Sequence, residues 1–141
     1  MCNPTQFAVV APSGDHWFAA YAERLTMQLN DVGRAARYSD HEDVPASDVV
    51  FLLSYPRLVP EAELKRHGKC VVVHASALPV GKGMSPMPWQ ILEGAREIPI
   101  TLFEAVPELD GGPIFLRSSI QTTGGELLPE LRQKLGDEIV K

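Results

Sequence analysis

Three short runs of mostly apolar residues constrain the fold of this chain more than any other feature. They are residues 6–12 (QFAVVAP), 48–53 (DVVFLL) and 70–74 (CVVVH). Continuous apolar runs of this length are typical of strands buried on both faces. The segments between them read as helices: 13–33 has apolar residues at helical spacing, and 60–68 opens with proline and closes with basic residues and a glycine. Strands alternating with helices predict an α/β fold with a mostly parallel central sheet flanked by helices on both faces.

The remaining segments extend this pattern. We expect a weak strand at 34–38, a short helix at 87–94, and two late strands at 99–106 and 112–120. An amphipathic helix closes the chain, with Leu128, Leu131, Leu135 and Ile139 on one side, and Gly33 stands where a helix end favours a left-handed residue. We expect one domain over residues 1–141. Because its last helix is still in pattern at Lys141, a domain cut short at its C-terminus is one of our expectations.

Composition excludes several classes of protein. The formal net charge of −5 and the absence of a Lys/Arg cluster argue against nucleic acid as a partner, because phosphate binding depends on cationic side chains. Two cysteines make no disulfide framework, and the chain begins without a signal-peptide pattern. No apolar run approaches the roughly 20 residues that span a bilayer. We therefore expect a cytoplasmic protein with neither a membrane nor a nucleic acid as its partner.

A histidine at the end of a buried strand is the first candidate for chemistry. His74 closes the run at 70–74 and is followed by a loop rich in proline, glycine and serine. In open parallel sheets, ligands bind where the loops gather at the carboxyl ends of the strands. Asp110, in a later loop, precedes two glycines, and the loop at 54–60 adds apolar residues between prolines. We expect the imidazole and the carboxylate to meet in a partly apolar pocket that supports proton transfer.

Each of these residues also has an ordinary structural interpretation. A histidine at a strand end is often satisfied by a backbone carbonyl, and an aspartate before Gly-Gly is often a turn former. Cys70 and His74 share a strand face, but two ligands do not make a zinc site, so no metal is expected. The other histidines, at 16, 41 and 67, lie in polar or helix-end contexts and are expected to face solvent.

Three separated segments resemble the formyltransferase family. They are HASALPVGKGMSPMPWQILEG, IPITLFEAVPELDGGPIF and SYPRLVPEAEL, which together cover about residues 49–116, and the resemblance extends over the first strand and helix. The family moves a formyl group from 10-formyltetrahydrofolate to an amine. The variant of these motifs looks closest to the small enzymes that act on nucleotide-linked amino sugars. Methionyl-tRNA and glycinamide ribonucleotide formyltransferases are more distant comparisons, and we do not expect the separate C-terminal domain of the tRNA enzymes here.

The resemblance implies a Rossmann-like formyltransferase fold and a role for each site residue. His74 would stabilise the oxyanion or relay the proton, and Asp110 would tune the imidazole and order the water that carries the proton. The folate is assigned to Arg57, Leu58, Val59, Val106, Leu109 and Asp110. The acceptor, a small molecule with a primary amine, is assigned to Ser76, Gly83 and Ser85.

One position departs from the family pattern. The family places an asparagine two residues before the histidine, whereas this chain has Val72. Loss of one oxyanion donor typically costs about 2.7–4 kcal/mol of transition-state stabilisation and leaves cofactor binding largely intact. Gln90 is the available amide that could substitute. Three hypotheses follow: an amino-sugar formyltransferase, a folate-binding homologue with weak or no catalysis, and a truncated, incomplete domain.

Overall fold

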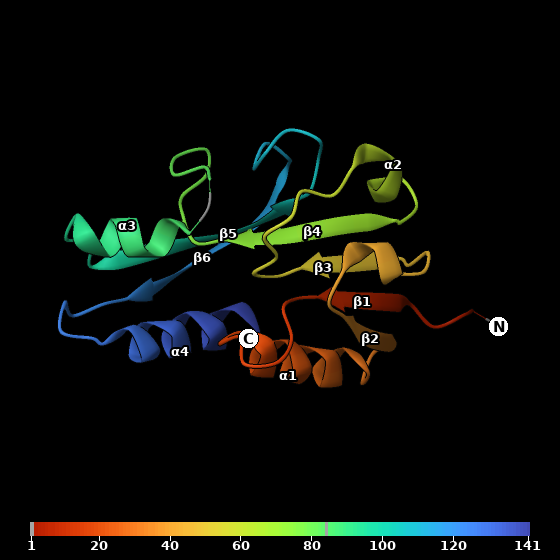
Figure 1. The fold of residues 1–141 in the computed structure, drawn as a ribbon, viewed down its shortest axis with the longest axis horizontal. Helices are drawn as coiled ribbons and strands as arrows, with labels where there is room; N and C mark the ends of the chain where they lie inside the picture. The colour runs from red at the N-terminus through yellow and green to blue at the C-terminus, as the bar shows by residue number, and fades with distance from the viewer. Residues whose placement is uncertain (1, 84) are drawn as a thin grey trace.

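A six-stranded sheet with the strand order β2-β1-β3-β4-β5-β6 forms the centre of the computed structural model (Figure 1). The structure describes residues 2–83 and 85–141. The strands are β1 (Gln6–Val10), β2 (Arg34–Tyr38), β3 (Val49–Leu52), β4 (Lys69–His74), β5 (Glu97–Glu104) and β6 (Ile114–Gln121). The helices are α1 (Ala19–Leu29), the 3-10 turn η1 (His41–Asp43), α2 (Glu61–Leu64), α3 (Pro86–Leu92) and α4 (Leu128–Ile139).

The sheet is parallel over four strands and antiparallel at one end. Strands β2, β1, β3 and β4 run parallel to their neighbours. Strand β5 is antiparallel to β4, with His74 opposite Thr101, and β6 is antiparallel to β5. The prediction of a mostly parallel sheet with flanking helices is therefore confirmed. The two late strands form an antiparallel hairpin at the edge of the sheet.

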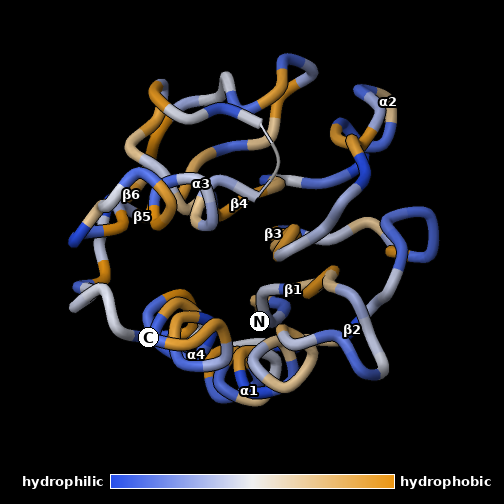
Figure 2. The backbone as a smooth tube through the Cα atoms, turned by 60° about the vertical axis from the view of Figure 1, so that its left-hand side comes forward, coloured by the Kyte–Doolittle hydropathy of each residue, from blue (hydrophilic) through white to orange (hydrophobic). Residues whose placement is uncertain are grey.

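Alternate residues of the strands feed cores on opposite faces of the sheet. On one face Ala8, Val10, Val50, Leu52 and Cys70 pack with Val44, and Leu64 of α2 covers them. On the other face, α1, α3 and α4 cover a core of different residues, which includes Val9, Phe18, Ala22, Ile98, Ile100, Leu131 and Leu135. Figure 2 shows hydrophobic stretches along the strands and in α4. This alternation is why the sequence of each central strand is apolar throughout.

Two local predictions in the first helix region were wrong. The helix begins at Ala19 rather than near residue 13, and His16 Nδ1 accepts a hydrogen bond from the Phe18 N–H at 3.1 Å just before it. Gly33 is not left-handed. A Cβ there would lie 2.5 Å from the carbonyl oxygen of Thr5, so the glycine permits close approach of two backbones.

The C-terminal helix follows its predicted pattern over most of its length. Leu131 and Leu135 are buried and Ile139 is half-buried, whereas Leu128 remains 46% exposed at the start of the helix. Within the described residues, no helix combines the length and the apolar character needed to cross a bilayer.

The buried position of Cys70 generates a prediction about thiol reactivity. Burial, with a smaller contribution from the charge of Glu104, raises the pKa of the Cys70 thiol from 9.0 to about 11. The thiolate is the reactive form, so at pH 8 a disulfide reagent should modify the exposed Cys2 but not Cys70 in the folded protein. Because the folded pKa lies above the unfolded one, this group's contribution to stability should be lost as the pH rises from 9 to 11.

Mass spectrometry of protein labelled with and without denaturant would count the modified thiols. A Cys2→Ser variant is the control and should take up no label until it unfolds. Rapid labelling of that folded variant at pH 8 would contradict the prediction.

Candidate functional site

His74 and Asp110 form a close pair at the end of β4. His74 Nε2 lies 3.6 Å from an Asp110 carboxylate oxygen, and their side chains are only 10% and 8% exposed. Nε2 also lies 2.7 Å from the carbonyl oxygen of Gly81. Since a carbonyl can only accept a hydrogen bond, Nε2 carries a proton and donates it. The prediction that the imidazole and the carboxylate lie close together is confirmed. The ordinary interpretation, a histidine bonded to a backbone carbonyl, also holds, because His74 bonds to Gly81.

In a fully parallel sheet, the loop after β5 would lie at the same edge as the end of β4, and Asp110 would meet His74 there. The structure places this loop differently. Because β5 is antiparallel, its carboxyl end lies beside the amino half of β4, where Val71 pairs with Glu104. The loop at 105–113 then rises on the α2 side of the sheet, as does the loop after β4 (Figure 1). The Gly83 N–H donates to the Asp110 carboxylate at 2.9 Å, which ties the two loops together.

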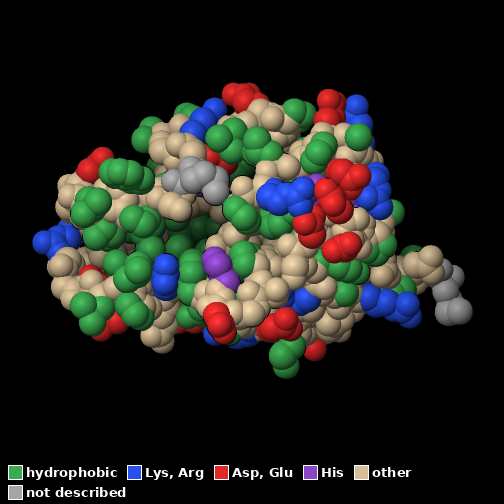
Figure 3. All heavy atoms as spheres, viewed as in Figure 1, with side chains coloured by type: hydrophobic (Ala, Val, Ile, Leu, Met, Phe, Trp, Pro, Cys, Tyr) green, Lys and Arg blue, Asp and Glu red, His purple; other side chains and the backbone are tan. Residues whose placement is uncertain are grey.

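A cleft of about 1110 Å³ opens beside this pair at the carboxyl ends of β1, β3 and β4. Figure 3 shows the hollow and the hydrophobic side chains around it. The cleft has two parts, which lie on opposite faces of the sheet. The loop arm is lined by Tyr55, Arg57, Leu58, Val59, Val72, Phe103, Val106, Leu109 and Asp110, and the helix arm by Asp15, His16, Trp17, Met87, Leu128, Arg132 and Ile139.

The structure brings all six predicted folate residues to the loop arm. Arg57, Leu58, Val59, Val106, Leu109 and Asp110 come from the loops after β3 and β5. The guanidinium of Arg57 is held by the carboxylates of Asp40 and Glu42, the latter at 3.1 Å. Two carboxylates of the protein thus balance the charge of Arg57, and these ion pairs hold the loop at 54–59 in place. Contact of these residues with folate stays a prediction.

A buried histidine supports the same loop. The prediction that His41 faces solvent was wrong, because its residue is only 4% exposed and its Nδ1 lies 2.7 Å from the Tyr55 hydroxyl. The hydroxyl also lies 3.3 Å from Asp40. Hydrogen bonding from the Glu42 backbone N–H, and then the charge of Arg57, lowers the pKa of Asp40. Asp40, His41 and Glu42 bring three potential metal ligands together, but Arg57 already occupies both carboxylates.

The predicted acceptor residues separate in the structure. Gly83 and Ser85 line the cleft, whereas Met84 between them lies outside the described residues. Ser76 is 2% exposed and is not on the cleft wall. It lies beneath Gly81, and its hydroxyl has no hydrogen-bond partner in the described structure. Ser76 therefore packs under the loop, and contact of Ser76 with an acceptor stays a prediction.

Val72 stands on the cleft wall, on the same strand face as His74. The proposed substitute, Gln90, does not reach the site. Its side-chain N–H groups donate to the carbonyls of Ala75 at 2.6 Å and Pro86 at 3.3 Å, so the amide is committed to holding α3 against the end of β4. The expectation that Gln90 could supply the missing donor is therefore not met.

Backbone strain gathers around the cleft. Within the described chain, the non-glycine residues with positive φ are Ser54, Ser85 and Asp110, with φ near 50°, and all three line it. Such conformations typically cost about 1–3 kcal/mol each and cluster at functional sites. The sequence carried no signal for the left-handed backbone of Ser54 or Ser85, since serine is common in ordinary loops. It also carried none for His16 and Arg132, which come together only when α1 and α4 pack side by side.

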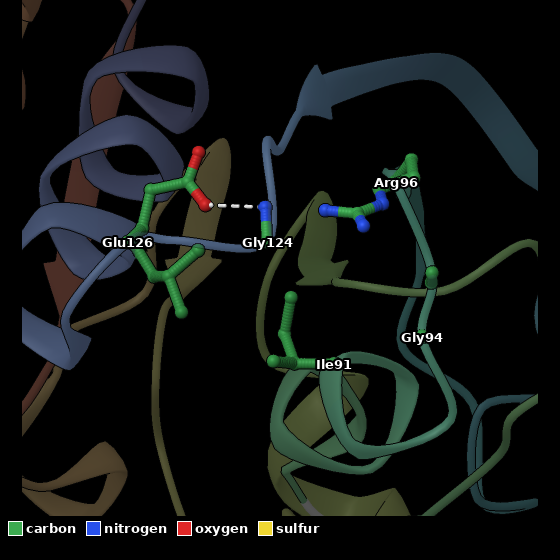
Figure 4. Close-up of a pocket in the computed structure, with 7 residues that line it drawn as sticks. Ile91, Gly94, Arg96, Gly124 and Glu126 are labelled. Carbon is green, nitrogen blue, oxygen red and sulfur yellow. Dashed lines mark hydrogen bonds between the residues drawn. The ribbon is translucent and has the colours of Figure 1, made fainter.

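A second cavity, of about 160 Å³, lies between α3 and the turn before α4 (Figure 4). Glu126 accepts hydrogen bonds from the backbone N–H groups of Thr123 and Gly124 at 2.7 and 3.0 Å and from Lys134 at 2.8 Å. The bond from Lys134, and then that from Thr123, lowers the pKa of this carboxyl. Arg96 donates to the Thr123 carbonyl. The polar groups around this cavity thus satisfy one another and hold the turn.

Comparison with known proteins identifies a common family. The profile described as Formyl transferase matches residues 20–140. Methionyl-tRNA formyltransferase of Alkaliphilus oremlandii is 33% identical over 90 residues, which cover 62% of this chain and 29% of that enzyme. The match thus spans less than a third of the length of this curated relative.

Solved structures share the fold at low sequence identity. Methionyl-tRNA formyltransferase from Clostridium thermocellum has a TM-score of 0.80 at 16% identity, over 97% of this chain and 61% of that one. Glycinamide ribonucleotide transformylase 1 from Geobacillus kaustophilus has a TM-score of 0.68 at 19% identity, over 98% and 94%. HypX from Aquifex aeolicus in complex with tetrahydrofolic acid has a TM-score of 0.67 at 18% identity, over 86% and 22%.

The glycine loop over His74 can be tested by paired substitutions. Gly81 has φ +78°, and a Cβ there would lie 2.8 Å from the Cβ of Ser76, whereas Gly14, with φ +69°, has nothing within 4 Å. Both Gly81→Ala and Gly14→Ala should lose about 1–2 kcal/mol to left-handed strain. Gly81→Ala should lose more, because its carbonyl and the Ser76 side chain must also shift. Urea unfolding of both variants checks this, and equal losses would contradict the packing of Gly81 on Ser76.

Proposed function

We propose that this chain, which belongs to the formyl transferase family, transfers a formyl group from 10-formyltetrahydrofolate to the primary amine of a nucleotide-linked amino sugar. The observation that carries the proposal is the buried His74 and Asp110 pair at the junction of the two arms of a large cleft. Related proteins include methionyl-tRNA formyltransferase and glycinamide ribonucleotide transformylase. The net charge of −5 favours a small acceptor over tRNA.

The loop arm suits a flat, partly apolar cofactor. Leu58, Val106 and Leu109 supply apolar surface, and we assign the hydrogen bonds to the pterin ring to the backbone of the loops that carry them. The ion pairs of Arg57 and the contact of Tyr55 with His41 hold one of these loops in place. Preorganised loops bind a rigid ring at lower entropic cost than mobile loops do.

The reaction needs one stabilised charge and one proton transfer. The amine nitrogen attacks the formyl carbon, and the carbonyl oxygen becomes an oxyanion as the tetrahedral intermediate forms. The N–H of His74 Nε2 stabilises that oxygen. Asp110 holds the imidazole and orders the water that carries a proton from the attacking amine to the folate nitrogen, which then leaves as the bond to the formyl carbon breaks.

His74 must exchange its partner for this chemistry. Its Nε2 proton is directed at the Gly81 carbonyl, so the oxyanion has to take the place of that carbonyl. The flanking glycines Gly81 and Gly83, both with positive φ, provide a short loop that can shift with little steric hindrance. The hydrogen bond from the Gly83 N–H to Asp110 couples such a shift to the second member of the pair.

A second candidate function is folate binding with weak or no transfer. Val72 favours it, because the side chain on the cleft wall beside His74 has no hydrogen-bond donor. The two candidates differ in product but not in cofactor binding. Mass spectrometry of incubations with 10-formyltetrahydrofolate and a panel of nucleotide-linked amino sugars tests them, since a gain of one formyl group supports transfer. A thermal shift with a folate analogue but no product across the panel would favour the second candidate.

Replacement of the imidazole should separate transfer from binding. We expect His74→Ala to lower the transfer rate by about 10²–10⁴-fold, because a positioned acid-base group is lost, while folate affinity stays within a few-fold. His67→Ala is the matched control, since His67 does not line the cleft and should leave the rate unchanged. Single-turnover kinetics at saturating cofactor measures both variants. An unchanged rate in His74→Ala would remove this residue from the mechanism.

Restoring an amide at position 72 should raise the rate. Val72→Asn places a donor on the face that His74 occupies and should speed transfer by up to about 10²-fold. It should also lower stability by about 1–3 kcal/mol, because the amide is partly buried without all its partners. Val72→Leu, similar in size and without a donor, is the control and should bring no gain. A Val72→Asn enzyme that is less stable and no faster would show that another group already serves the oxyanion or that this chain does not transfer.

A further inference from the structure

Arg132 of α4 is a cation in the cleft that the protein leaves without a carboxylate. Among the described residues, Arg57 and Arg132 are the two arginines on the cleft wall. Arg57 is held by two carboxylates, whereas every described carboxylate lies more than 4.0 Å from the Arg132 nitrogens. Arg132 packs over the Trp17 ring, with its Cζ 5.6 Å from the ring centroid. Arg132 is half-buried, and its guanidinium N–H groups can donate hydrogen bonds to an anion in the cleft.

The surroundings of Arg132 add a second donor. His16 Nδ1 accepts the Phe18 N–H, so in the neutral imidazole Nε2 carries the proton and donates. Burial, and then the charge of Arg132, lowers the pKa of His16 and keeps this ring neutral near pH 7. Apolar groups, Leu128 and Ile139 among them, line the rest of this arm. These groups strengthen a charge-assisted hydrogen bond by excluding water.

The acidic residues of the cleft lie apart from this site or are exposed. Glu108 and Asp110 belong to the loop at 105–113, where Lys82 lies 3.3 Å from Glu108 and the Gly83 N–H donates to Asp110. Asp15, beside His16 in sequence, is exposed on the cleft rim and beyond ion-pair distance of Arg132. Figure 3 shows basic and histidine side chains together on the rim of the hollow above α4.

We propose that the helix arm binds the acceptor and that Arg132 and His16 hold its diphosphate. This inference rests on the proposed function, because it assigns the charged end of the acceptor whose amine reacts at His74. A bidentate guanidinium matches the geometry of a phosphate, and the neutral imidazole supplies one more N–H. The indole of Trp17, which the guanidinium faces, keeps the fork in place.

The spacing across the sheet agrees with such a ligand. β1, whose following loop carries His16 and Trp17, lies two strands away from β4, which ends at His74. Two inter-strand steps separate these strand ends by roughly 10 Å. A sugar ring followed by a diphosphate has comparable reach, so the amine can lie at His74 while the diphosphate lies at Arg132.

Calorimetry tests this assignment. It measures the affinity of the protein for inorganic pyrophosphate and for several nucleoside diphosphates that differ in their base. Arg132→Gln should weaken the affinity for all of these probes by about 10-fold to 100-fold, the usual effect of losing a charge-assisted bond. Arg132→Lys keeps the charge without the fork and should lose less. Arg34→Gln is the matched control, because it removes the same charge from an exposed position on β2 outside the cleft. It should bind as the wild type does.

A wild-type protein that does not bind pyrophosphate or any of the diphosphates would overturn the proposal. So would an Arg132→Gln variant that binds them normally, or one that instead loses affinity for tetrahydrofolate. The last result would assign Arg132 to the carboxylate tail of folate. Failure of the proposed function is distinguishable from these results. A wild type that binds diphosphates through Arg132 but forms no formylated product supports the anion site and contradicts transfer. Formylated product with an unchanged acceptor KM in Arg132→Gln contradicts the anion site alone.

Discussion

The backbone pairing of β4 with β3 on one side and β5 on the other holds the whole site in place. Parallel pairing with β3 buries Cys70 and aligns the carboxyl ends of the central strands, where the cleft opens. Antiparallel pairing with β5 sets Thr101 opposite His74, and the Thr101 hydroxyl donates to the Ser76 carbonyl at 2.6 Å beyond the end of the strand. The backbone of β4 is thus held by main-chain bonds to two neighbouring strands, and its last residue, His74, is paired with β5.

Polar groups near His74 are few, and nearly all of them have partners. The Gly81 carbonyl accepts from the imidazole and Asp110 accepts from the Gly83 N–H, so two loops from distant parts of the chain hold each other. The Ser76 hydroxyl, without a partner in the described structure, lies directly under Gly81. A left-handed backbone at Asp110 is the strain that accompanies this arrangement. Such a site is rigid through mutual constraint, and its weakest part is the glycine loop.

The two arms of the cleft differ in charge because they are built from different elements. Loops after β3 and β5 form the loop arm, and their charged side chains have partners in the protein: Arg57 pairs with Asp40 and Glu42, and Glu108 pairs with Lys82. The helix arm has a cation on α4, Arg132, that contacts the aromatic face of Trp17 and has no carboxylate partner in the described part of the chain. An uncharged cofactor ring is suited to the first environment and an anionic ligand to the second. His74, at the end of β4, lines the same cleft as both arms.

The alternation of apolar strands with helical segments was sufficient to predict the α/β class and the strands. The positions of His74 and Asp110 next to predicted strands, within recognisable motifs, were sufficient to predict that they lie together. Periodicity and motif order are local properties of a chain, so both predictions could be made without a structure.

Other features required the tertiary structure. The direction of β5, the burial of His41 and the commitment of Gln90 to backbone carbonyls depend on which segments pack together. Arg132 joins the cleft only because α4 packs beside the start of α1, and no local pattern records a contact between residues so far apart in the sequence. The sequence by itself therefore determined the elements and the pairing of His74 with Asp110, whereas the packing of those elements decided the shape of the cleft and the charges that line it.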